Sequence, residues 1–223
     1  THGARFAHEP GLAVELSEAG ARGIYTSLDG VTPETNPKSY PEFPDALAAC
    51  REAGLCAMLV PTVVGGWNDD GLGDLVRFGA ANADVVCGIN LQPVSFVGRM
   101  ADADRRARRV TVSDVVDRIA ADTDGAVPRE AWFPLPALRA LTDVVSAWTG
   151  GGLYGVAGTF SAWLVTVVLV EDDEIVPITE VVDVQGLLAD LREAVASVDV
   201  DLADAGRLDR LRVARRLSDG VTD

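Results

Sequence analysis

Three short apolar runs alternate with helix-like segments over the first hundred residues of the chain. The runs are almost free of charge and rich in aliphatic or β-branched side chains, and they cover residues 23–28, 56–64 and 85–91. Runs of this kind are typical of parallel strands that are covered on both faces. Apolar side chains recur at helical spacing before and between the runs, so helices are expected at residues 11–19, 41–53 and 70–81.

The strand starts near residues 23, 56 and 85 give repeats of 33 and 29 residues. Each repeat has the length of one strand, one helix and two loops, which predicts a β-α-β-α-β series and an α/β fold with parallel strands. The spacing fits part of a (β/α) barrel and half of a doubly wound sheet equally well. Ligands bind at the carboxyl ends of the strands in both architectures. The segments expected at those ends are residues 27–30, 61–70 and 92–98.

The character of the chain changes after its first hundred residues. Residues 99–109 form a charge-rich link with five arginines, and residues 111–121 have the pattern of an amphipathic helix. Thr111 and Asp114 stand at capping-box spacing at the start of that helix. Prolines then break the chain around two aromatic side chains, which indicates a packed loop. We therefore expect two regions, a parallel βα region over residues 1–100 and a smaller α+β C-terminal region over residues 101–223.

Residues 144–170 carry no charge, and the stretch is long enough to cross a lipid bilayer. Five glycines and a β-branched end that runs into four acidic residues favour a buried strand over a membrane helix. A returning strand is expected at residues 175–184, so that the two strands form a hairpin. The tail over residues 185–213 is predicted to be an amphipathic helix with one solvated face. No transmembrane span is expected.

Amino-acid composition limits the kinds of partner, the salt conditions and the cellular compartment that are expected for the protein. Its 223 residues include 34 acids, of which 23 are Asp, and 19 bases, of which only Lys38 is a lysine, for a net charge of −15. Nucleic acid is not an expected partner, because phosphate binding depends on clustered Lys and Arg. The surface predicts a halophilic protein adapted to high salt, with an ordinary acidic protein from a GC-rich genome as the alternative. Three cysteines and no signal-peptide pattern favour the cytoplasm.

The residues with distinctive side-chain chemistry are few and scattered. His2 and His8 have no second histidine or cysteine at metal-ligand spacing, and His8 is expected to lie in a polar surface loop. Cys50, Cys56 and Cys87 fall in apolar helices or strands, so all three are predicted to be buried hydrophobic residues. No nucleophile elbow, no serine–histidine–acid set and no carboxylate pair in an apolar setting is present. The sequence alone therefore assigns no catalytic residue and no metal ligand.

Polar residues that follow the predicted strands are the candidates for ligand binding. The segment 65–70 can present backbone N–H groups to a phosphate or carboxylate, or it can cap the next helix with Asn or Asp. Ser27 and Asp29 offer a hydroxyl and a carboxylate that suit a ribose or an ammonium group, with a tight turn as the competing interpretation. Gln92 can read a base edge or satisfy neighbouring backbone groups. These residues indicate a ligand-binding βα protein.

Several motifs, taken in order, resemble the later strands and the C-terminal region of a radical S-adenosylmethionine (SAM) enzyme. They are THG at 1–3, YTSLDGVTPE at 25–34, LVPTVV at 59–64 with Asn68-Asp69, GINLQPVSF at 88–96, FPLP at 133–136, VPIT at 176–179 and VDV at 182–184. The branch that they resemble includes the archaeal tetraether lipid synthases and the dihydropterin dimethyltransferases. The resemblance implies that residues 1–100 supply the later part of a radical SAM (β/α) barrel, a partial barrel of parallel strands, and that residues 101–223 supply its C-terminal region.

The resemblance also implies chemistry, cofactors and partners. It implies 5′-deoxyadenosyl-radical chemistry on a lipid or pterin-like substrate, as C–C coupling or methylation, with SAM and a [4Fe-4S] cluster as cofactors. A reductant protein such as a ferredoxin is the implied partner. The cofactor and substrate contacts fall on residues that follow the strands: Ser27 and Asp29 for the ribose or methionine end, Thr62, Val64 and Asn68 for the adenosine side, and Gln92 and Ser95 for adenine or substrate.

Two departures from the family pattern limit what the chain does by itself. The cluster-binding Cys-x3-Cys-x2-Cys motif and the glycine-rich SAM motif of the family would both precede Thr1, so the cluster ligands are absent from this chain. Where related proteins carry a cysteine after a Pro-x-Pro segment, Ala137 stands here. The chain is therefore expected to begin mid-gene as an inactive fragment, or to be a divergent homologue. A nonradical βα-barrel enzyme that binds a phosphorylated metabolite and a noncatalytic binding module remain open.

Overall fold

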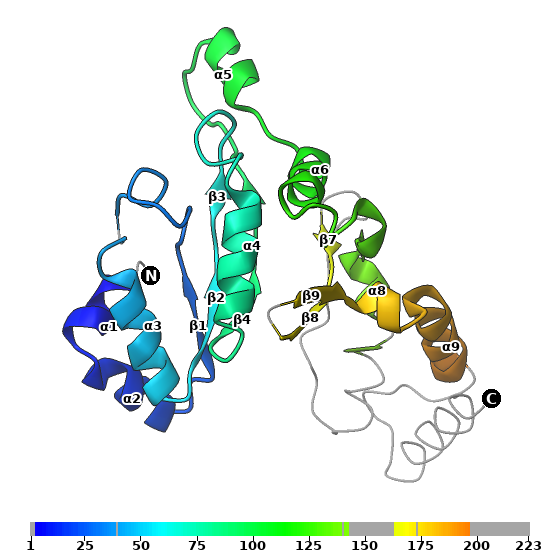
Figure 1. The fold of residues 1–223 in the computed structure, drawn as a ribbon, viewed down its shortest axis with the longest axis horizontal. Helices are drawn as coiled ribbons and strands as arrows, with labels where there is room; N and C mark the ends of the chain where they lie inside the picture. The colour runs from blue at the N-terminus through cyan, green and yellow to red at the C-terminus, as the bar shows by residue number, and fades with distance from the viewer. Residues whose placement is uncertain (1–2, 39, 140, 143–162, 173, 197–223) are drawn as a thin grey trace. The chain divides into compact units, whose positions relative to one another are not determined.

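The computed structural model describes residues 3–38, 40–139, 141–142, 163–172 and 174–196. The chain forms two compact units (Figure 1). The first comprises residues 1–129 and 170–175, and the second comprises residues 130–169 and 176–223. Each unit contains its own cluster of buried hydrophobic side chains, so each is described by itself.

Three parallel strands form the centre of the first unit. They are β1 (Gly23–Thr26), β2 (Cys56–Leu59) and β4 (Val86–Ile89), and they lie in the order β1-β2-β4. Both pairs are parallel, as predicted from the apolar runs and their spacing. The prediction of an α/β fold with neighbouring parallel strands is therefore confirmed. Within the described residues these strands form an open sheet, and no closed barrel is seen.

The apolar run at residues 56–64 is divided into two strands, where the sequence predicted one. β2 ends at Leu59, and β3 (Thr62–Val63) begins after Pro61, which has no N–H to donate to a neighbouring strand. β3 pairs in parallel with β5 (Gln92–Pro93) as a separate two-stranded sheet. The pair lies just beyond the carboxyl ends of β2 and β4, and so it extends the edge at which ligand binding is expected.

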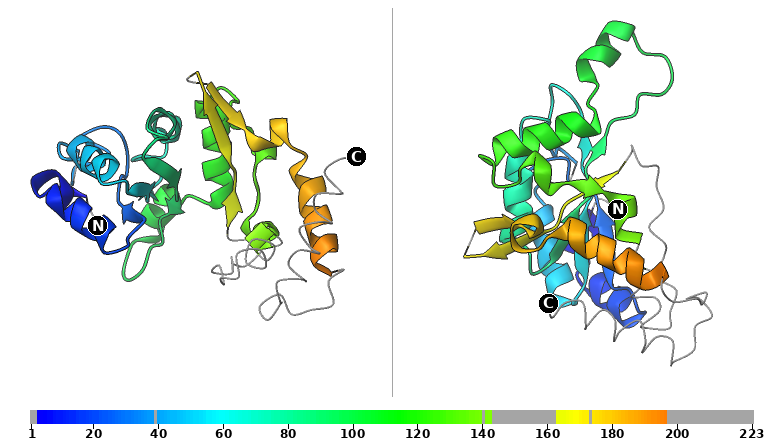
Figure 2. Two further views of the ribbon diagram at one scale, coloured as in Figure 1. Left: turned by 90° about the horizontal axis from the view of Figure 1, so that it is seen from below. Right: turned by 90° about the vertical axis from the view of Figure 1, so that its right-hand side faces the viewer.

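Three helices pack against one another beside the sheet, as Figures 1 and 2 show. They are α1 (Ala4–His8), α2 (Gly11–Glu18) and α3 (Phe43–Glu52). α2 and α3 were predicted, and each is followed by a glycine with positive φ, 97° at Gly20 and 67° at Gly54, where glycine ends a helix without strain. α1 was not predicted. It has only five residues, too few for the apolar periodicity that signals a helix.

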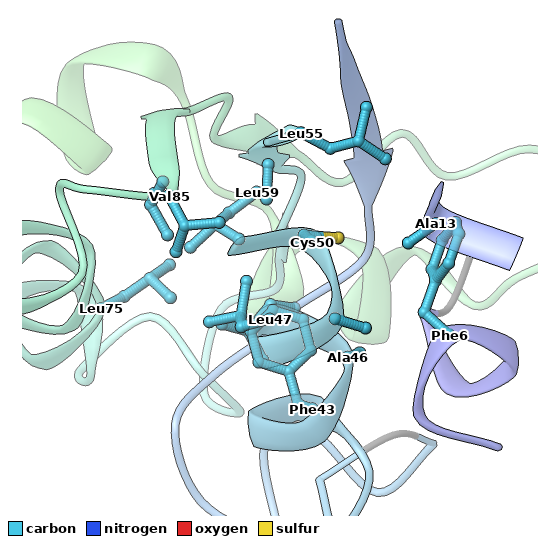
Figure 3. Close-up of a cluster of buried hydrophobic side chains, with 14 residues drawn as sticks. Phe6, Ala13, Phe43, Ala46, Leu47, Cys50, Leu55, Leu59, Leu75 and Val85 are labelled. Atoms are coloured by element: carbon cyan, nitrogen blue, oxygen red, sulfur yellow. The ribbon is translucent and has the colours of Figure 1, made fainter. Parts of the chain in front are cut away.

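The core of the first unit lies between these helices and the three strands (Figure 3). Phe43, Leu47 and Cys50 occupy one face of α3, as their spacing predicted, and all three are buried. Leu59 of β2 and Leu75 of α4 (Leu72–Ala81) belong to the same cluster. Burial of one such side chain contributes about 2 kcal/mol to the free energy of unfolding, so this layer fixes the sheet that carries the candidate site.

Two further helices of the first unit follow the sheet in sequence. α5 (Asp102–Arg108) has no buried residue, whereas α6 (Val112–Asp122) packs against α4 (Leu72–Ala81). The predicted capping box at the start of α6 is confirmed. The Asp114 N–H donates to Thr111 Oγ1 at 3.2 Å, and the Thr111 N–H donates to Asp114 Oδ2 at 2.8 Å.

The second unit is built from short elements around a small core. β6 (Phe133–Pro134) pairs antiparallel with β7 (Leu164–Val165). β8 (Val168–Glu171) pairs with β9 (Glu174–Pro177), and residues 170–175 of this pair are counted with the first unit. Short 3-10 helices cover Arg129–Ala131 and Leu135–Leu138, and α-helices cover α8 (Ile178–Val181) and α9 (Val184–Ala196). The buried core residues are Phe133, Val184, Leu188 and Leu191. Phe133 therefore packs inward, as expected of the aromatic loop.

The strand predicted at residues 175–184 is shorter than expected. β9 ends at Pro177, which occupies the N-cap of α8, and the Ile178 N–H donates to the Val167 carbonyl at 2.8 Å. Pro177 has no N–H to donate to a neighbouring strand, which favours the end of β9 here in spite of the β-branched residues that follow. Most of the uncharged stretch and the tail beyond residue 196 lie outside the described residues. Among the helices that are described, none has the length and hydropathy needed to cross a bilayer.

Candidate functional site

A hydrogen bond joins the loops that follow two neighbouring strands. Asp29 lies three residues beyond the end of β1 and is 8% exposed. Its Oδ1 accepts the backbone N–H of Thr62, the first residue of β3, at 2.8 Å. A carboxylate can accept about four hydrogen bonds, so Asp29 retains acceptor capacity beyond this one. The sequence placed both residues at the carboxyl edge of the sheet, and the structure brings them into direct contact.

Asn68 ties three segments of this edge together. Its Nδ2 donates to the Asp29 carbonyl at 2.7 Å and to the Thr62 carbonyl at 2.9 Å, and its Oδ1 accepts the Val64 N–H at 2.8 Å. The side chain is 2% exposed, and both amide hydrogens are used. Asn68 therefore has no donor left for a ligand. Asn68 is therefore a structural residue, or brace, that holds the backbone of Asp29, Thr62 and Val64 in place.

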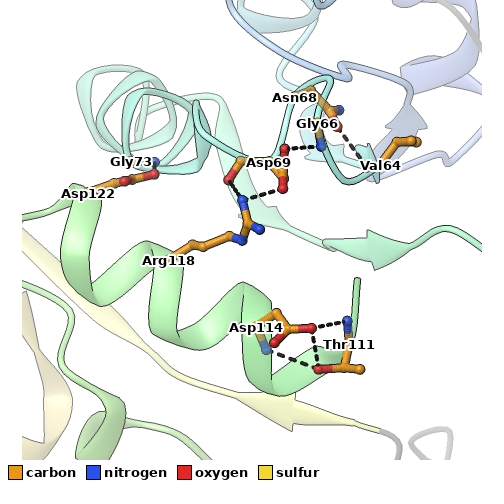
Figure 4. A network of polar contacts seen from close by, with 9 residues as sticks. All are labelled: Val64, Gly66, Asn68, Asp69, Gly73, Thr111, Asp114, Arg118 and Asp122. Atoms are coloured by element: carbon orange, nitrogen blue, oxygen red, sulfur yellow. Dashed lines mark hydrogen bonds and ion pairs between the residues drawn. The ribbon is translucent and has the colours of Figure 1, made fainter. Parts of the chain in front are cut away.

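Asp69 fixes the turn that follows β3, as Figure 4 shows. Its Oδ1 accepts the Gly66 N–H at 2.7 Å, and its Oδ2 forms an ion pair with Arg118 of α6. The Arg118 guanidinium also donates to the Asp69 carbonyl at 3.2 Å. The Asp69 side chain is 5% exposed and that of Arg118 is 41% exposed. A helix from beyond residue 100 thus holds the loop that follows β3.

The loop after β1 is also held against the loop after β3. The Trp67 indole N–H donates to the Glu34 carbonyl at 3.2 Å. Gly30 has to be glycine, because a Cβ at this position would lie 2.0 Å from Thr35 Oγ1. Thr32 and Thr35 are linked by hydroxyl and backbone hydrogen bonds within the same turn. The segment that resembles the family's Asp-Gly-Val-Thr-Pro-Glu loop is therefore internally ordered.

The same carboxyl edge also carries polar side chains that are exposed or half-buried. Thr62 and Gln92 are directly opposite each other in the β3–β5 register, and both are exposed. Ser95, just beyond β5, is exposed, and Ser27, just beyond β1, is half-buried. These four side chains make no hydrogen bond to any residue that the structure describes. The carboxyl edge therefore combines buried braces with polar side chains that a ligand can reach.

The glycine-rich loop uses its own N–H groups. The Gly65 N–H donates to the Arg108 carbonyl at 3.0 Å, and the Gly66 N–H is taken by Asp69. α4 begins after Gly71 without a side-chain cap. The interpretation as an Asn or Asp cap on the helix is therefore wrong, and the N–H groups of Gly65 and Gly66 are not available to an anion. Asn68 and Asp69 satisfy the loop itself.

The three cysteines differ in their environments. Cys50 is buried in α3, and this burial, with a smaller effect of Cys56, raises the pKa of its thiol. Cys56 is half-buried, whereas Cys87 is exposed, so the prediction of three buried cysteines is wrong for Cys87. Val86 occupies the buried face of β4, so the alternation of the strand places Cys87 on the opposite, more exposed face. Among the described residues no three His, Cys, Asp or Glu side chains gather as a metal site.

Sequence reasoning missed the supporting role of α6. Arg118 braces the site through Asp69, and Gly73 of α4 lets the Asp122 backbone approach so closely that a Cβ at Gly73 would lie 2.6 Å from the Asp122 carbonyl oxygen. Neither relationship leaves a pattern at short range, because the partners are 49 residues apart. Gly3, just before α1, lies close to Thr26 of β1, since a Cβ at Gly3 would be 3.1 Å from Thr26 Oγ1. Residues 1 and 2, which belong to the same THG motif, lie outside the described residues.

Comparison with known proteins finds a relative that matches most of this chain. The chain is 31% identical over 191 residues to the 7,8-dihydro-6-hydroxymethylpterin dimethyltransferase of Methanocaldococcus jannaschii. It is a distant homologue of part of that enzyme. The match takes in 82% of this chain and 38% of the methyltransferase, so the chain spans less than half of the relative's length. The similarity agrees with the branch indicated by the sequence motifs. No protein-family model matches the chain.

Proposed function

We propose that the chain is the later part of a radical SAM enzyme that acts on a pterin-like substrate. Residues 1–100 would supply the last strands of its (β/α) barrel, and residues 101–223 its C-terminal region. The observation that carries the proposal is the braced carboxyl edge, where Asp29, Thr62 and Asn68 join the loops of successive parallel strands. The similarity to a pterin methyltransferase favours methylation of a pterin over coupling of lipid chains.

The described residues do not fit a [4Fe-4S] cluster. Such a cluster needs cysteine thiolates gathered at one place. Cys50 lies within the core, and Cys56 and Cys87 lie in the amino-terminal halves of β2 and β4, away from the braced edge. The cluster of the proposed enzyme would therefore be held by residues outside this chain, and a ferredoxin-like reductant would serve that part of the enzyme.

The residues that fit SAM or substrate are the polar ones at the carboxyl edge. The hydroxyls of Ser27, Thr62 and Ser95 and the amide of Gln92 provide the donors and acceptors that an adenosine or a pterin ring requires. Asp29 has remaining acceptor capacity for a ribose hydroxyl or an ammonium group. Val64 and Asn68 would act by position, because the Val64 N–H and the Asn68 amide are engaged with each other.

Direct binding tests this assignment. Equilibrium dialysis with radiolabelled SAM should show saturable binding to the whole chain, weakened about 10-fold in Thr62→Val and Gln92→Ala, since each removes a hydrogen bond to the ligand. Gln185→Ala, an exposed amide of α9 in the second unit, serves as the matched control and should bind as the natural chain does. Equal affinity in all four proteins would contradict the placement of SAM at this edge.

The activity requires the complete gene product. Under reducing conditions that protein should release 5′-deoxyadenosine from SAM, and addition of a dihydropterin should yield a methylated product. A complete product without an upstream cysteine triad would contradict the proposal. Stabilisation of the chain by a phosphorylated metabolite, but not by SAM, in a thermal melt would instead support a nonradical barrel enzyme.

A further inference from the structure

Trp67 is a large aromatic side chain that remains partly exposed at the braced carboxyl edge. It lies in the turn after β3, next to Asn68, and it is 39% exposed. Tryptophan has one of the largest apolar surfaces among the side chains, and folding buries most of it where the core has room. The exposed part of the Trp67 ring is therefore apolar surface that a ligand at this edge can cover.

The hydrogen-bond donor of the Trp67 indole is already engaged within the protein. Its Nε1–H donates to the Glu34 carbonyl, in the loop after β1, at 3.2 Å. The tryptophan side chain has no other donor and no acceptor. A ligand that reaches Trp67 therefore meets the apolar π surface of the ring, which favours a planar aromatic group over a phosphate.

Trp67 and Asn68 hold the loop after β1 at two points. The Asn68 Nδ2 donates to the Asp29 carbonyl at 2.7 Å, and the Trp67 indole donates to Glu34, further along the same loop. The Asp29 carboxylate in turn accepts the Thr62 N–H at 2.8 Å. The aromatic ring and the carboxylate of the candidate site therefore belong to one set of hydrogen-bonded loops.

The backbone on both sides of Trp67 is fixed as well. The Trp67 N–H donates to the Val64 carbonyl at 3.2 Å, and the Gly66 N–H donates to Asp69 Oδ1 at 2.7 Å. The ion pair of Asp69 with Arg118 connects this turn to α6 (Figure 4). A side chain that is fixed before a ligand binds loses little conformational freedom on binding. The turn therefore presents the indole as a preformed surface.

We propose that Trp67 binds a planar bicyclic nitrogen heterocycle by stacking against its exposed ring surface. This assignment rests on the proposed function, in which the pterin-like substrate and the adenine of SAM both carry a ring of this kind. Stacking on an aromatic side chain depends on the π surfaces and needs no further donor or acceptor. The hydrogen bonds that select the ligand would come from the polar side chains of the same edge.

Equilibrium dialysis of the whole chain with 6-hydroxymethyl-7,8-dihydropterin and, separately, with radiolabelled SAM tests this role. Trp67→Leu keeps an apolar side chain but has no π surface, so it should weaken binding of the stacked ligand about 10-fold. A loss for the dihydropterin alone identifies the substrate ring as the one that stacks, and a loss for SAM alone identifies adenine. Trp163→Leu, at an exposed tryptophan of the second unit, is the matched control and should bind both ligands as the natural chain does.

A second variant separates stacking from support of the loop. Trp67→Phe keeps an aromatic ring but loses the hydrogen bond to Glu34, so its affinity should stay within about 3-fold of the natural value. The far-ultraviolet circular dichroism of both variants should match that of the natural chain. Equal losses in Trp67→Phe and Trp67→Leu would show that Trp67 only holds the loop, and would overturn the proposal. Undiminished binding of both ligands in Trp67→Leu would overturn it as well.

The outcome for Trp67 can be told apart from the outcome for the radical SAM function. If SAM binding depends on Thr62 and Gln92, and neither ligand depends on Trp67, the stacking role fails and the proposed function stands. If dihydropterin binding depends on Trp67, while the chain does not bind SAM and the complete gene product releases no 5′-deoxyadenosine, the stacking role stands and the proposed function fails.

Discussion

Asn68 and Asp29 are joined by a hydrogen bond from the Asn68 Nδ2 to the Asp29 carbonyl at 2.7 Å, across 39 residues of sequence. Asp29 in turn accepts the N–H of Thr62, whose carbonyl accepts the second amide hydrogen of Asn68. The three residues therefore form a closed set of contacts between the loops after β1 and β3. Because Asp29 and Asn68 are buried, water does not replace these hydrogen bonds when one partner is removed.

Replacement of Asn68 should destabilise the first unit strongly. Asn68→Ala removes three hydrogen bonds and leaves buried backbone groups unpaired, so we expect the free energy of unfolding to fall by about 3 kcal/mol. Urea denaturation monitored by circular dichroism measures the change. Asn82→Ala is the control. This half-buried side chain donates from Nδ2 to the Phe78 carbonyl and accepts a long, exposed hydrogen bond of 3.4 Å from Arg51 at Oδ1, so its loss should cost about 1 kcal/mol. Similar losses in the two variants would contradict the role of Asn68 as a brace.

The ion pair between Arg118 and Asp69 should matter more than its partly exposed arginine suggests. Arg118→Ala leaves the Asp69 carboxylate, which is 5% exposed, without its cation, at a cost of about 2 kcal/mol. Arg105→Ala removes an exposed ion pair with Asp102 and should cost less than about 1 kcal/mol. Thermal melts of both variants, compared with the natural chain, give the two values. If Arg105→Ala proves the more damaging change, Arg118 does not hold the loop.

The sequence predicted the elements that have a strong local signal. The strands around Ile24, Met58 and Cys87 have apolar runs, and the capping box of Thr111 and Asp114 follows from residue types three apart. Their parallel order followed from the lengths of the intervening segments. The segments at the carboxyl edge were also named correctly, because that edge is determined by the order of strands and loops alone.

What could not be predicted depends on contacts between distant residues. The sequence does not indicate that the Asn68 side-chain amide hydrogen-bonds to backbone groups, since an Asn in a loop can equally face a ligand. Cys87 lies in a continuous apolar run, which predicts burial on both faces of the sheet, but only the face that carries Val86 is buried among the described residues. The split of one apolar run at Pro61 was visible in principle, because proline cannot donate within a sheet.

The capping box of α6 stabilises the folded chain by an amount that decreases at acid pH. Hydrogen bonds from the Thr111 hydroxyl and then from its backbone N–H lower the pKa of Asp114. The carboxylate therefore stabilises the folded chain above the usual Asp pKa of about 3.9, and this contribution is lost as the pH falls through the lower pKa of the folded state. At pH 7, Asp114→Ala should cost about 1 kcal/mol, the usual effect of losing a cap.

Chemical denaturation of Asp114→Ala between about pH 7 and pH 3 tests this dependence. The difference from the natural chain should shrink over the acid part of the range. Ser113→Ala, in the same turn, removes a side chain that does not titrate, so its difference should stay nearly constant. A gap between Asp114→Ala and the natural chain that is independent of pH would exclude the carboxylate as the source.

The charge of the chain predicts that salt stabilises it by screening. With a net charge of −15, acidic side chains repel one another, and raising KCl from about 0.1 M to 1 M shortens the Debye length from about 10 Å to about 3 Å. The melting temperature should therefore rise with KCl.

Glu15, Glu18 and Glu52 are exposed, and they make no ion pair within the described residues. Replacing all three by Gln should reduce the gain, because less repulsion is left to screen. Sucrose, which is uncharged and excluded from protein surfaces, should raise the melting temperature of both proteins equally. An equal gain in KCl would show that salt acts through general exclusion and not through these charges.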